Sequence, residues 1–238
     1  MKEYFYDLHI HSALSPCGDD DMTPANIAAM ANLKGLDIIA VSDHNTCMNC
    51  SAVKQCADEY GILVIPAMEL NTAEEIHVLC LFKDIEKAKK FGEYVYSTLP
   101  EIKNKADIYG HQYVMDKNEK ILDDIPKLLI TASSIGISEV QQKVKQFGGI
   151  SIPAHVDKNS YSLISVLGTI PSEYGFSAFE VSANADIEHL KNDFPQLCNK
   201  TILSSSDAHY LWQINERINS IKMSEKSIEA FFDAIKQE

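Results

Sequence analysis

Arginine is almost absent from this sequence. Among its 238 residues, Lys and Arg together number 21 against 34 acidic residues, and Arg217 is the one arginine. The formal net charge of −13 argues against a broad basic surface, so stable binding of duplex nucleic acid is not expected. Bound divalent cations could offset part of this charge, because a site of carboxylates and imidazoles is net negative until it is metallated.

Long hydrophobic runs are also missing. The sequence contains no stretch of about 18 apolar residues that could span a bilayer. Residues 1–7 contain no apolar signal core, so we expect a cytoplasmic protein without membrane contacts. The six cysteines are then expected to be reduced thiols or metal ligands rather than a disulfide framework.

The sequence shows no internal repeats, low-complexity tracts or proline-rich linkers, which predicts a single domain over residues 1–238. Short segments rich in Ile, Val and Phe alternate with helical patterns, as is typical of strands joined by crossover helices. Seven strands, enough to close a barrel, are expected near residues 4–10, 37–42, 62–68, 76–82, 149–154, 177–181 and 201–205.

Capping signals predict where helices begin and end. Thr23 and Pro24 should open a helix that stops at Gly35, and Gly61 should end the next one. Residues 138–141 have the pattern of a capping box before a helix that stops at Gly148.

The stretch at about 84–147 is predicted to be a helical insertion or cap. A helix over 85–99 is followed by a polar segment around 104–124 and then by another helix. The last helix of the chain is expected over about 225–236.

The strongest chemical signal is the sequence DLHIHS at residues 7–12, at the end of the first expected strand. Because successive strand residues point to opposite faces, Asp7, His9 and His11 share one face. Two imidazoles placed in this way can hold one metal ion. Standing alone, the pair would more often be ordinary histidines at a strand edge.

Ligand-type side chains also follow four other expected strands, and these residues are His44, Glu69, His155, Asp207 and His209. In a barrel of parallel strands the carboxyl ends lie on one side, so these segments should converge. Charged groups there are costly unless they are paired or bound to metal. The pattern predicts a metal site, and mixed imidazole and carboxylate ligands suit zinc, manganese or iron.

In order along nearly the whole chain, these motifs resemble the PHP (polymerase and histidinol phosphatase) domain family, in particular its small stand-alone phosphoesterases. The matching motifs are DLHIHS at 7–12, SDHN at 42–45, PAMEL at 66–70, EIHVL at 75–79, PAH at 153–155 and SDAH at 206–209. The resemblance implies an α/β fold, namely a distorted seven-stranded (β/α)7 barrel similar to a TIM barrel, with two or three divalent ions.

The resemblance also implies which residues bind these ions. A first ion would lie on His9, His11, Glu69 and Asp207. Glu69 would bridge to a second ion held by His77 and His209. A third ion would take His44, His155 and an acid from the loop after His11.

That acid is where this sequence departs from the family pattern. Family members often have Ser-Asp-Gly shortly after the second histidine, whereas here the loop reads SPCGDDD at residues 15–21. Counting back from Pro24 favours Asp19, and Asp20 and Asp21 remain alternatives.

Other polar residues have weaker signals. His77 lies inside an expected strand and could be a satisfied core residue, although a ligand role is favoured. His111 and His189 lie outside every motif and are expected to be surface or packing residues. Glu180, late on a strand, could orient an imidazole, or it could be an exposed or paired glutamate.

The cysteines give no clear metal motif. Cys47 and Cys50 form one Cys-x-x-Cys pair after His44, which without a second pair is weak support for redox chemistry or a further metal. We expect these two, and Cys17 in the loop after His11, to be buried or loop thiols. Cys56 and Cys80 should be core residues, and the position of Cys198 is uninformative.

The predicted function is hydrolysis of a phosphomonoester, or of a nucleotide or oligonucleotide phosphodiester, by a metal-activated hydroxide. The expected substrate is a small phosphorylated compound or a short nucleic acid. Asp207 belongs to the expected catalytic set, and His155 or His209 could assist the leaving group, while Lys158 and Arg217 could hold the substrate phosphate. Two alternatives remain, a metal-dependent C–N hydrolase and a non-catalytic metal-binding regulatory module.

Overall fold

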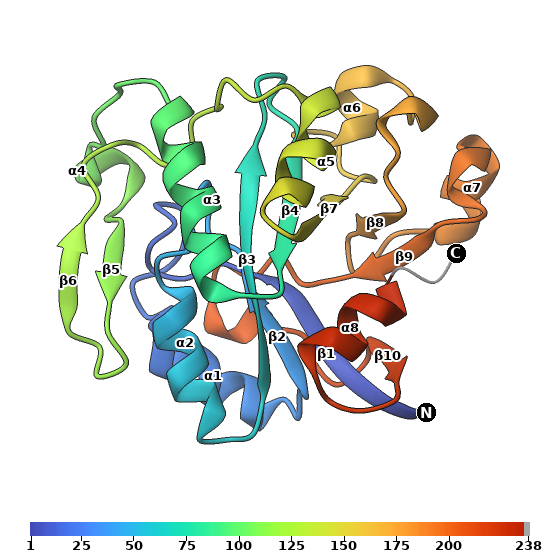
Figure 1. Ribbon diagram of the computed structural model, residues 1–238. Helices are drawn as coiled ribbons and strands as arrows, with labels where there is room; N and C mark the ends of the chain where they lie inside the picture. Colours follow the sequence, from blue (N-terminus) through green and yellow to red (C-terminus); the bar gives the residue numbers. More distant parts are fainter. Residues whose placement is uncertain (236–238) are drawn as a thin grey trace.

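The sheet that organises the protein is curled and mixed (Figure 1). The structure is a computed structural model that describes residues 1–235. Six strands form the sheet in the order β10-β1-β2-β3-β4-β7. Their bounds are Lys2–Ile10 for β1, Ile38–Val41 for β2, Leu63–Asn71 for β3, His77–Phe82 for β4, Gly149–Pro153 for β7 and Ser220–Met223 for β10.

Strand direction explains how distant residues reach one edge of this sheet. β1, β2 and β3 are parallel neighbours, so their carboxyl ends lie on the same side. β4 runs antiparallel to β3, and its first residue, His77, therefore pairs with Asn71 at the end of β3. β7 reverses direction again beside β4. The expectation of an edge built from carboxyl ends alone is wrong for β4, which contributes its amino end.

The two remaining predicted strands stand apart from the sheet. β8 (Ala178–Val181) and β9 (Thr201–Ser204) form a separate parallel pair. A few backbone hydrogen bonds link this pair and the segment after it to the neighbouring segments. They include the bonds from Val156 N–H to Glu180 O and from His11 N–H to Ala208 O, both 2.9 Å. All seven predicted strands exist, but only five of them join the curled half-barrel sheet, whose sixth strand, β10, was not predicted. Within residues 1–235 the predicted seven-stranded (β/α)7 barrel is therefore not confirmed.

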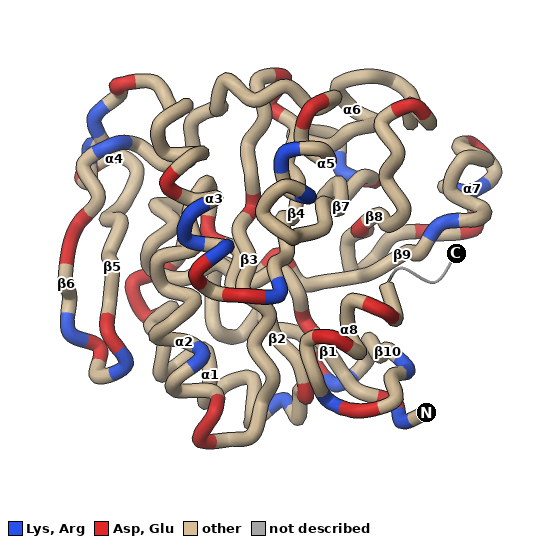
Figure 2. The backbone as a smooth tube through the Cα atoms, viewed as in Figure 1, with Lys and Arg blue, Asp and Glu red and all other residues tan. Residues whose placement is uncertain are grey.

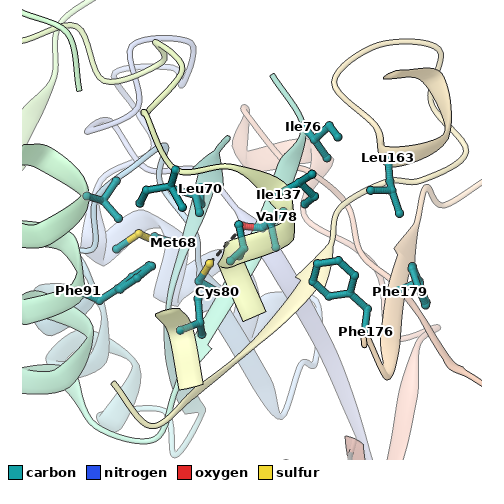
Figure 3. Close-up of a cluster of buried hydrophobic side chains, with 14 of the residues drawn as sticks. Met68, Leu70, Ile76, Val78, Cys80, Phe91, Ile137, Leu163, Phe176 and Phe179 are labelled. Carbon is teal, nitrogen blue, oxygen red and sulfur yellow. Dashed lines mark hydrogen bonds between the residues drawn. The ribbon is translucent and has the colours of Figure 1, made fainter. Parts of the chain in front are cut away.

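Helices cover the convex side of the sheet in two groups. α1 (Pro24–Leu33) and α2 (Cys50–Asp58) pack against β1, β2 and β3 through buried residues that include Ile27 and Val53. α3 (Ile85–Thr98) and α5 (Ile137–Gln146) pack against β3 and β4. Figure 3 shows Phe91 of α3 beside Met68 of β3, and Ile137 of α5 above Val78 of β4.

A second apolar core fills the inside of the curled sheet. It is built from alternating strand residues such as Leu8, Ile65 and Leu79, together with Leu203 of β9. The last helix, α8 (Ile228–Ile235), adds the fully buried rings of Phe231 and Phe232. The helix was expected to reach Lys236, which lies outside the described residues.

The predicted helix starts are correct at α1 and wrong at α5. The Thr23 hydroxyl accepts the Asn26 N–H at 3.3 Å, and Pro24 is the first helical residue. For α5 the helix begins at Ile137, so Ser138 lies inside the helix rather than capping it. The Ile137 N–H is instead satisfied by the distant Glu74 carboxylate at 2.8 Å, a tertiary contact that local sequence does not encode.

Residues 84–147 contain a hairpin that was not predicted. After α3 come α4 (Ala106–Tyr109), β5 (Tyr113–Met115), β6 (Ile121–Asp124) and then α5. The hairpin projects at one side of the molecule (Figure 1, green). Its strands are short, and all residues of β6 are exposed, so no apolar alternation marks them.

The other elements are short connections. They are α6 (Leu163–Leu167), α7 (Ile187–Asp193) and the 3₁₀ turns η1 (Ser172–Tyr174), η2 (Pro195–Leu197) and η3 (Leu211–Gln213). Within the described part of the chain, no helix has both the length and the apolar character needed to cross a membrane.

The packing inside the curled sheet predicts how much the loss of one aromatic ring destabilises the protein. Phe231→Ala should lower the free energy of unfolding by about 3–5 kcal/mol, because it removes a fully buried ring and leaves a cavity inside the curled sheet. Urea denaturation followed by circular dichroism, with a chelator present to remove the contribution of bound metal, measures this. Asp233→Ala on the exposed face of the same helix is the control. Equal stability of both variants would contradict the packing described.

Candidate metal centre

Six imidazoles and two carboxylates gather at one edge of the curled sheet. His9 and His11 come from the end of β1 and the residue after it, and His44 follows β2. The other residues lie near the end of β3, at the start of β4, and after β7 and β9, and they are Glu69, His77, His155, Asp207 and His209.

The Glu69 carboxylate lies at the middle of this group and is almost completely buried. Its Oε1 atom lies 2.9 Å from His77 Nδ1, and 3.2 Å from both His9 Nε2 and His155 Nε2. Its Oε2 atom lies 3.0 Å from His44 Nδ1 and 3.4 Å from His11 Nε2. Each oxygen therefore faces a different set of imidazoles.

Asp207 closes the other side of the same group. Its Oδ1 atom lies 3.2 Å from His11 Nε2 and 3.3 Å from His9 Nε2. Its Oδ2 atom pairs with the Lys158 ammonium. The His209 ring stacks on His11 with centroids 4.3 Å apart, and its Nδ1 atom lies 2.9 Å from the Asp207 carbonyl oxygen.

Three sets of side chains have ligand atoms within 4.8 Å of one another: His9, His11 and Glu69; His44, Glu69 and His77; and His11, Cys17, His44 and His209. This grouping differs from the one implied by family resemblance, which paired His77 with His209. The reversed direction of β4 is the cause, because it places His77 beside Glu69 and His44.

The donor chemistry of these sets fits divalent cations. The Nε2 atoms of His9 and His11 are 3.2 Å apart, while their Nδ1 atoms contact the Glu180 carboxylate at 2.9 Å and the Ser15 hydroxyl at 3.0 Å. A proton on each Nδ1 leaves the Nε2 lone pairs free for a metal. Buried His44 Nδ1 and Glu69 Oε2 face each other at 3.0 Å, yet neither makes a hydrogen bond of good geometry among residues 1–235, and a cation bound by both would satisfy them.

Burial and neighbouring charges set the ionisation of this group. Burial raises the pKa of Glu69, but His77, His9 and His44 outweigh it and hold that pKa well below the usual range. Burial keeps the pKa of His11 well below the ordinary value, so this imidazole is neutral and able to ligate. Burial also disfavours a charged His9, yet Glu180 and Glu69 raise its pKa, so metal binding there competes with a proton.

Buried acids hold the loops that carry the ligands. Asp43 accepts hydrogen bonds from the backbone and the hydroxyl of Ser12, both at 2.7 Å, and from the Ser15 hydroxyl at 2.8 Å. Asp7 accepts the N–H groups of Ser206 and Asn215, each at 3.0 Å. Sequence reasoning missed these roles, although both acids lie inside the DLHIHS and SDHN motifs that it used.

Glu180 and strained backbone conformations also help to fix the positions of His155 and Asp207. Glu180 Oε2 accepts the His155 N–H at 3.1 Å and also contacts His9, so the expected contact of Glu180 with an imidazole is present. His155 and Asp207 have φ values of 31° and 53°, in the left-handed region that side chains rarely adopt. Such strain concentrates where a site over-determines the backbone.

Several expected site residues lie elsewhere. The Asp19 carboxylate accepts the Asp21 N–H at 3.0 Å and belongs to none of the three sets, while Asp20 and Asp21 are exposed. The Arg217 guanidinium lies 4.1 Å over the Phe5 ring, near the start of β1 and away from the ligands. It also donates to Gly35 O at 3.2 Å.

The remaining histidines and cysteines behave as surface or core groups. His111 pairs with Asp124 at 2.8 Å and His189 is exposed. All six cysteines are free thiols. Cys50 packs its sulfur against backbone carbonyls, and burial raises its pKa to about 12. Cys17 differs, because the partial desolvation of its sulfur is outweighed by His44 and His209, which bring its pKa down to about 6.

A cavity of about 650 Å³ opens above the centre. Its floor includes Glu69, Asp207 and four of the six histidines, namely His44, His77, His155 and His209, and Lys158 is the basic residue among its lining groups. One wall comes from residues 100–132, within the stretch predicted as an insertion or cap, and its apolar members are Pro100, Ile102, Tyr109, Leu128 and Ile130.

A curled β-sheet covered by helices, with histidines and carboxylates clustered at one edge, is typical of metal-dependent hydrolases. A model of the PHP domain matches residues 7–164, and the chain belongs to the PHP domain family. This confirms the family that the motifs predicted.

Two curated relatives match only part of the chain. An uncharacterized protein from Methanocaldococcus jannaschii is 37% identical over 90 residues, which are 34% of this chain and 53% of the relative. A 5′-3′ exoribonuclease from Haemophilus influenzae is 33% identical over 79 residues, covering 32% of this chain and 28% of the enzyme. The matches thus span about half or less of these relatives.

Solved structures show the same fold at low identity. The lesion-specific endonuclease Q from Pyrococcus furiosus has a TM-score of 0.71 and 20% identity, covering 99% of this chain and 56% of that protein. A protein from Bifidobacterium adolescentis, provisionally assigned as a metal-dependent phosphoesterase, has a TM-score of 0.64 and 15% identity, covering 96% of this chain and 94% of that one.

Because Glu69 belongs to two of the three sets, its substitution should change the amount of bound metal more than substitution of a residue that belongs to one. Glu69→Ala should reduce bound metal by more than one equivalent, because two of the three sets use this carboxylate, whereas His77→Ala should remove at most one. Elemental analysis after reconstitution and desalting measures both losses. His189→Ala, a substitution on the surface, is the control and should bind as much metal as the wild type. An unchanged metal content in Glu69→Ala would contradict a role for Glu69 in two sets.

Proposed function

We propose that this protein is a metal-dependent phosphoesterase, with a nucleotide or a short single-stranded nucleic acid as the preferred substrate. The observation that carries the proposal is the convergence of three overlapping sets of ligand-type side chains, two of which share Glu69, at the floor of one cavity. When bound, divalent ions there would supply a hydroxide nucleophile and neutralise the phosphoryl oxygens. The remaining steps depend on the side chains around them.

Lys158 is the residue best placed to bind substrate phosphate. It lines the cavity and pairs with Asp207. Burial lowers the pKa of Lys158, but Asp207 outweighs it and raises that pKa above the ordinary value, so the side chain stays a cation. Asp207 thereby holds a positive charge beside the ligands. A role for His155 or His209 as a proton donor to the leaving group remains a prediction.

Aromatic groups around the cavity support a substrate with a base. Tyr109 and Tyr161 line it, and Tyr161 stacks on His77 with centroids 4.8 Å apart. Directly after His209, the exposed rings of Tyr210 and Trp212 stack with centroids 6.0 Å apart. Exposed aromatic rings are what single-stranded nucleic acid stacks on.

Charge favours a single strand over a duplex. In the view of residues 1–235 in Figure 2, basic residues lie in short separated segments among acidic ones. The net charge of −13 and the position of Arg217 over Phe5 leave the cavity with Lys158 as its basic group. Binding along many duplex phosphates requires a continuous basic surface. Two or three ions of zinc, manganese or iron remain the proposed cofactors.

A substrate panel tests the proposal. Protein reconstituted with Mn²⁺, Zn²⁺ or Fe²⁺ should release phosphate or nucleotide from a phosphomonoester, a phosphodiester or a 5′-phosphorylated oligonucleotide, and should prefer the single-stranded form. The double variant His9→Ala with His11→Ala should lose metal and activity together, whereas His189→Ala should keep both. Turnover of amide substrates alone would support the C–N hydrolase instead. No turnover of any substrate by fully metallated protein would support a regulatory module.

Substitutions of the two basic candidates, Lys158 and Arg217, are expected to have different effects on kcat/KM. Lys158→Ala should lower kcat/KM by about ten- to a hundredfold, because it removes a charge-assisted contact of roughly 1.5–3 kcal/mol. Arg217→Ala should change kcat/KM by less than about twofold, because its guanidinium lies over Phe5. Steady-state kinetics at saturating metal decide the matter. A change below about twofold in both variants would show that Lys158 does not hold the phosphate.

A further inference from the structure

Cys17 lies where the sequence led us to expect a carboxylate. Its sulfur and ligand atoms of His11, His44 and His209 all lie within 4.8 Å of one another. The residue is exposed toward the cavity, whereas His11 and His44 are buried. Four side chains of ligand type therefore surround one point, and three of them come from separate segments of the chain.

Backbone packing fixes the path of the loop that carries Cys17. At Gly18, an added Cβ atom would lie 2.5 Å from the Ser12 carbonyl oxygen, and at Gly110 one would lie 2.4 Å from the Pro16 carbonyl oxygen. Only glycine allows approaches this close. The loop is also tied to the ligand segment itself, because the Asp19 N–H donates to His209 O at 2.9 Å.

The two neighbouring histidines are prepared to ligate with Cys17. The His209 Nδ1 atom contacts the Asp207 carbonyl oxygen at 2.9 Å, which places a proton on that nitrogen and leaves Nε2 as the lone-pair donor. His44 Nδ1 is buried and lies 3.0 Å from Glu69 Oε2, but it makes no hydrogen bond of good geometry in the described chain. A buried imidazole nitrogen without a hydrogen bond, on a ring that belongs to the Cys17 cluster, is a second observation that points to a cation.

We propose that the Cys17 thiolate is a metal ligand. Together with His44 and His209 it forms a metal position with a soft sulfur donor, and His11 lies between this position and the set that contains His9 and Glu69. This inference rests on the proposed metal centre and names one of its ligands. Thiolate and imidazole ligands select zinc or iron(II), whereas carboxylate-rich positions also suit manganese and magnesium. The position beside Cys17 therefore prefers Zn²⁺ or Fe²⁺ to Mn²⁺.

Cobalt substitution tests the ligand directly. Wild-type protein loaded with Co²⁺ should show a near-ultraviolet thiolate-to-cobalt charge-transfer band, and Cys17→Ser should lose this band together with one metal equivalent. Cys17→Asp should regain the equivalent without the band and should shift the competition between Zn²⁺ and Mn²⁺ toward Mn²⁺ by roughly tenfold or more. Cys198→Ser, the other exposed cysteine, is the matched control and should keep both the band and the metal.

The outcomes separate this ligand from the rest of the proposal. A Cys17→Ser protein with an unchanged cobalt spectrum and full metal content would overturn the inference. Loss of turnover in that variant with all metal retained would also overturn it, in favour of a nucleophilic thiol. A wild-type protein that shows the band but hydrolyses no phosphate ester would support Cys17 as a ligand while overturning the proposed function. A wild-type protein that binds no ion would overturn both.

Discussion

The buried carboxylate of Glu69, surrounded by imidazoles, is the constraint on which this structure depends. A charge removed from water in this way costs several kcal/mol unless close partners compensate it, and Glu69 has five histidines within 3.4 Å. These histidines come from β1, β4 and the segments after β1, β2 and β7. The curl of the sheet, the reversed direction of β4 and the strained backbone at His155 all serve to bring them to one carboxylate.

The sequence was sufficient to predict the histidines and acids of the centre, because alternation along β1 and the order of the motifs place them at strand ends. It was not sufficient to predict their grouping. That depends on the direction of β4, which a short apolar segment such as 77–82 does not reveal. Asp19 stays an untested prediction, and counting along the chain cannot show that the loop turns tightly at Gly18 and places Cys17, rather than Asp19, in one of the three sets.

The features of the fold that the sequence did not predict correctly also depend on contacts between distant segments or on short elements. The start of α5 depends on Glu74 from a distant loop. The hairpin at 113–124 gives no apolar pattern, because β5 has only three residues and β6 is exposed along its length. The barrel expected from seven strands is a half-barrel because β8 and β9 pair with each other rather than joining a continuous ladder. Local sequence patterns predicted seven of the ten strands found in residues 1–235 and missed β5, β6 and β10, whereas contacts between distant segments decided how the strands join.

The backbone hydrogen bonds between β1 and the segment at 206–209 have a consequence for how the protein is made. The Ala208 N–H donates to His9 O at 3.1 Å, and the His11 N–H donates to Ala208 O at 2.9 Å, so the centre is completed by residues nearly two hundred positions apart. Pairing across such a separation costs loop-closure entropy, and contacts of this kind slow folding. A nascent chain emerging from the ribosome therefore presents His9 and His11 long before the segment that carries Asp207 and His209 has been synthesised.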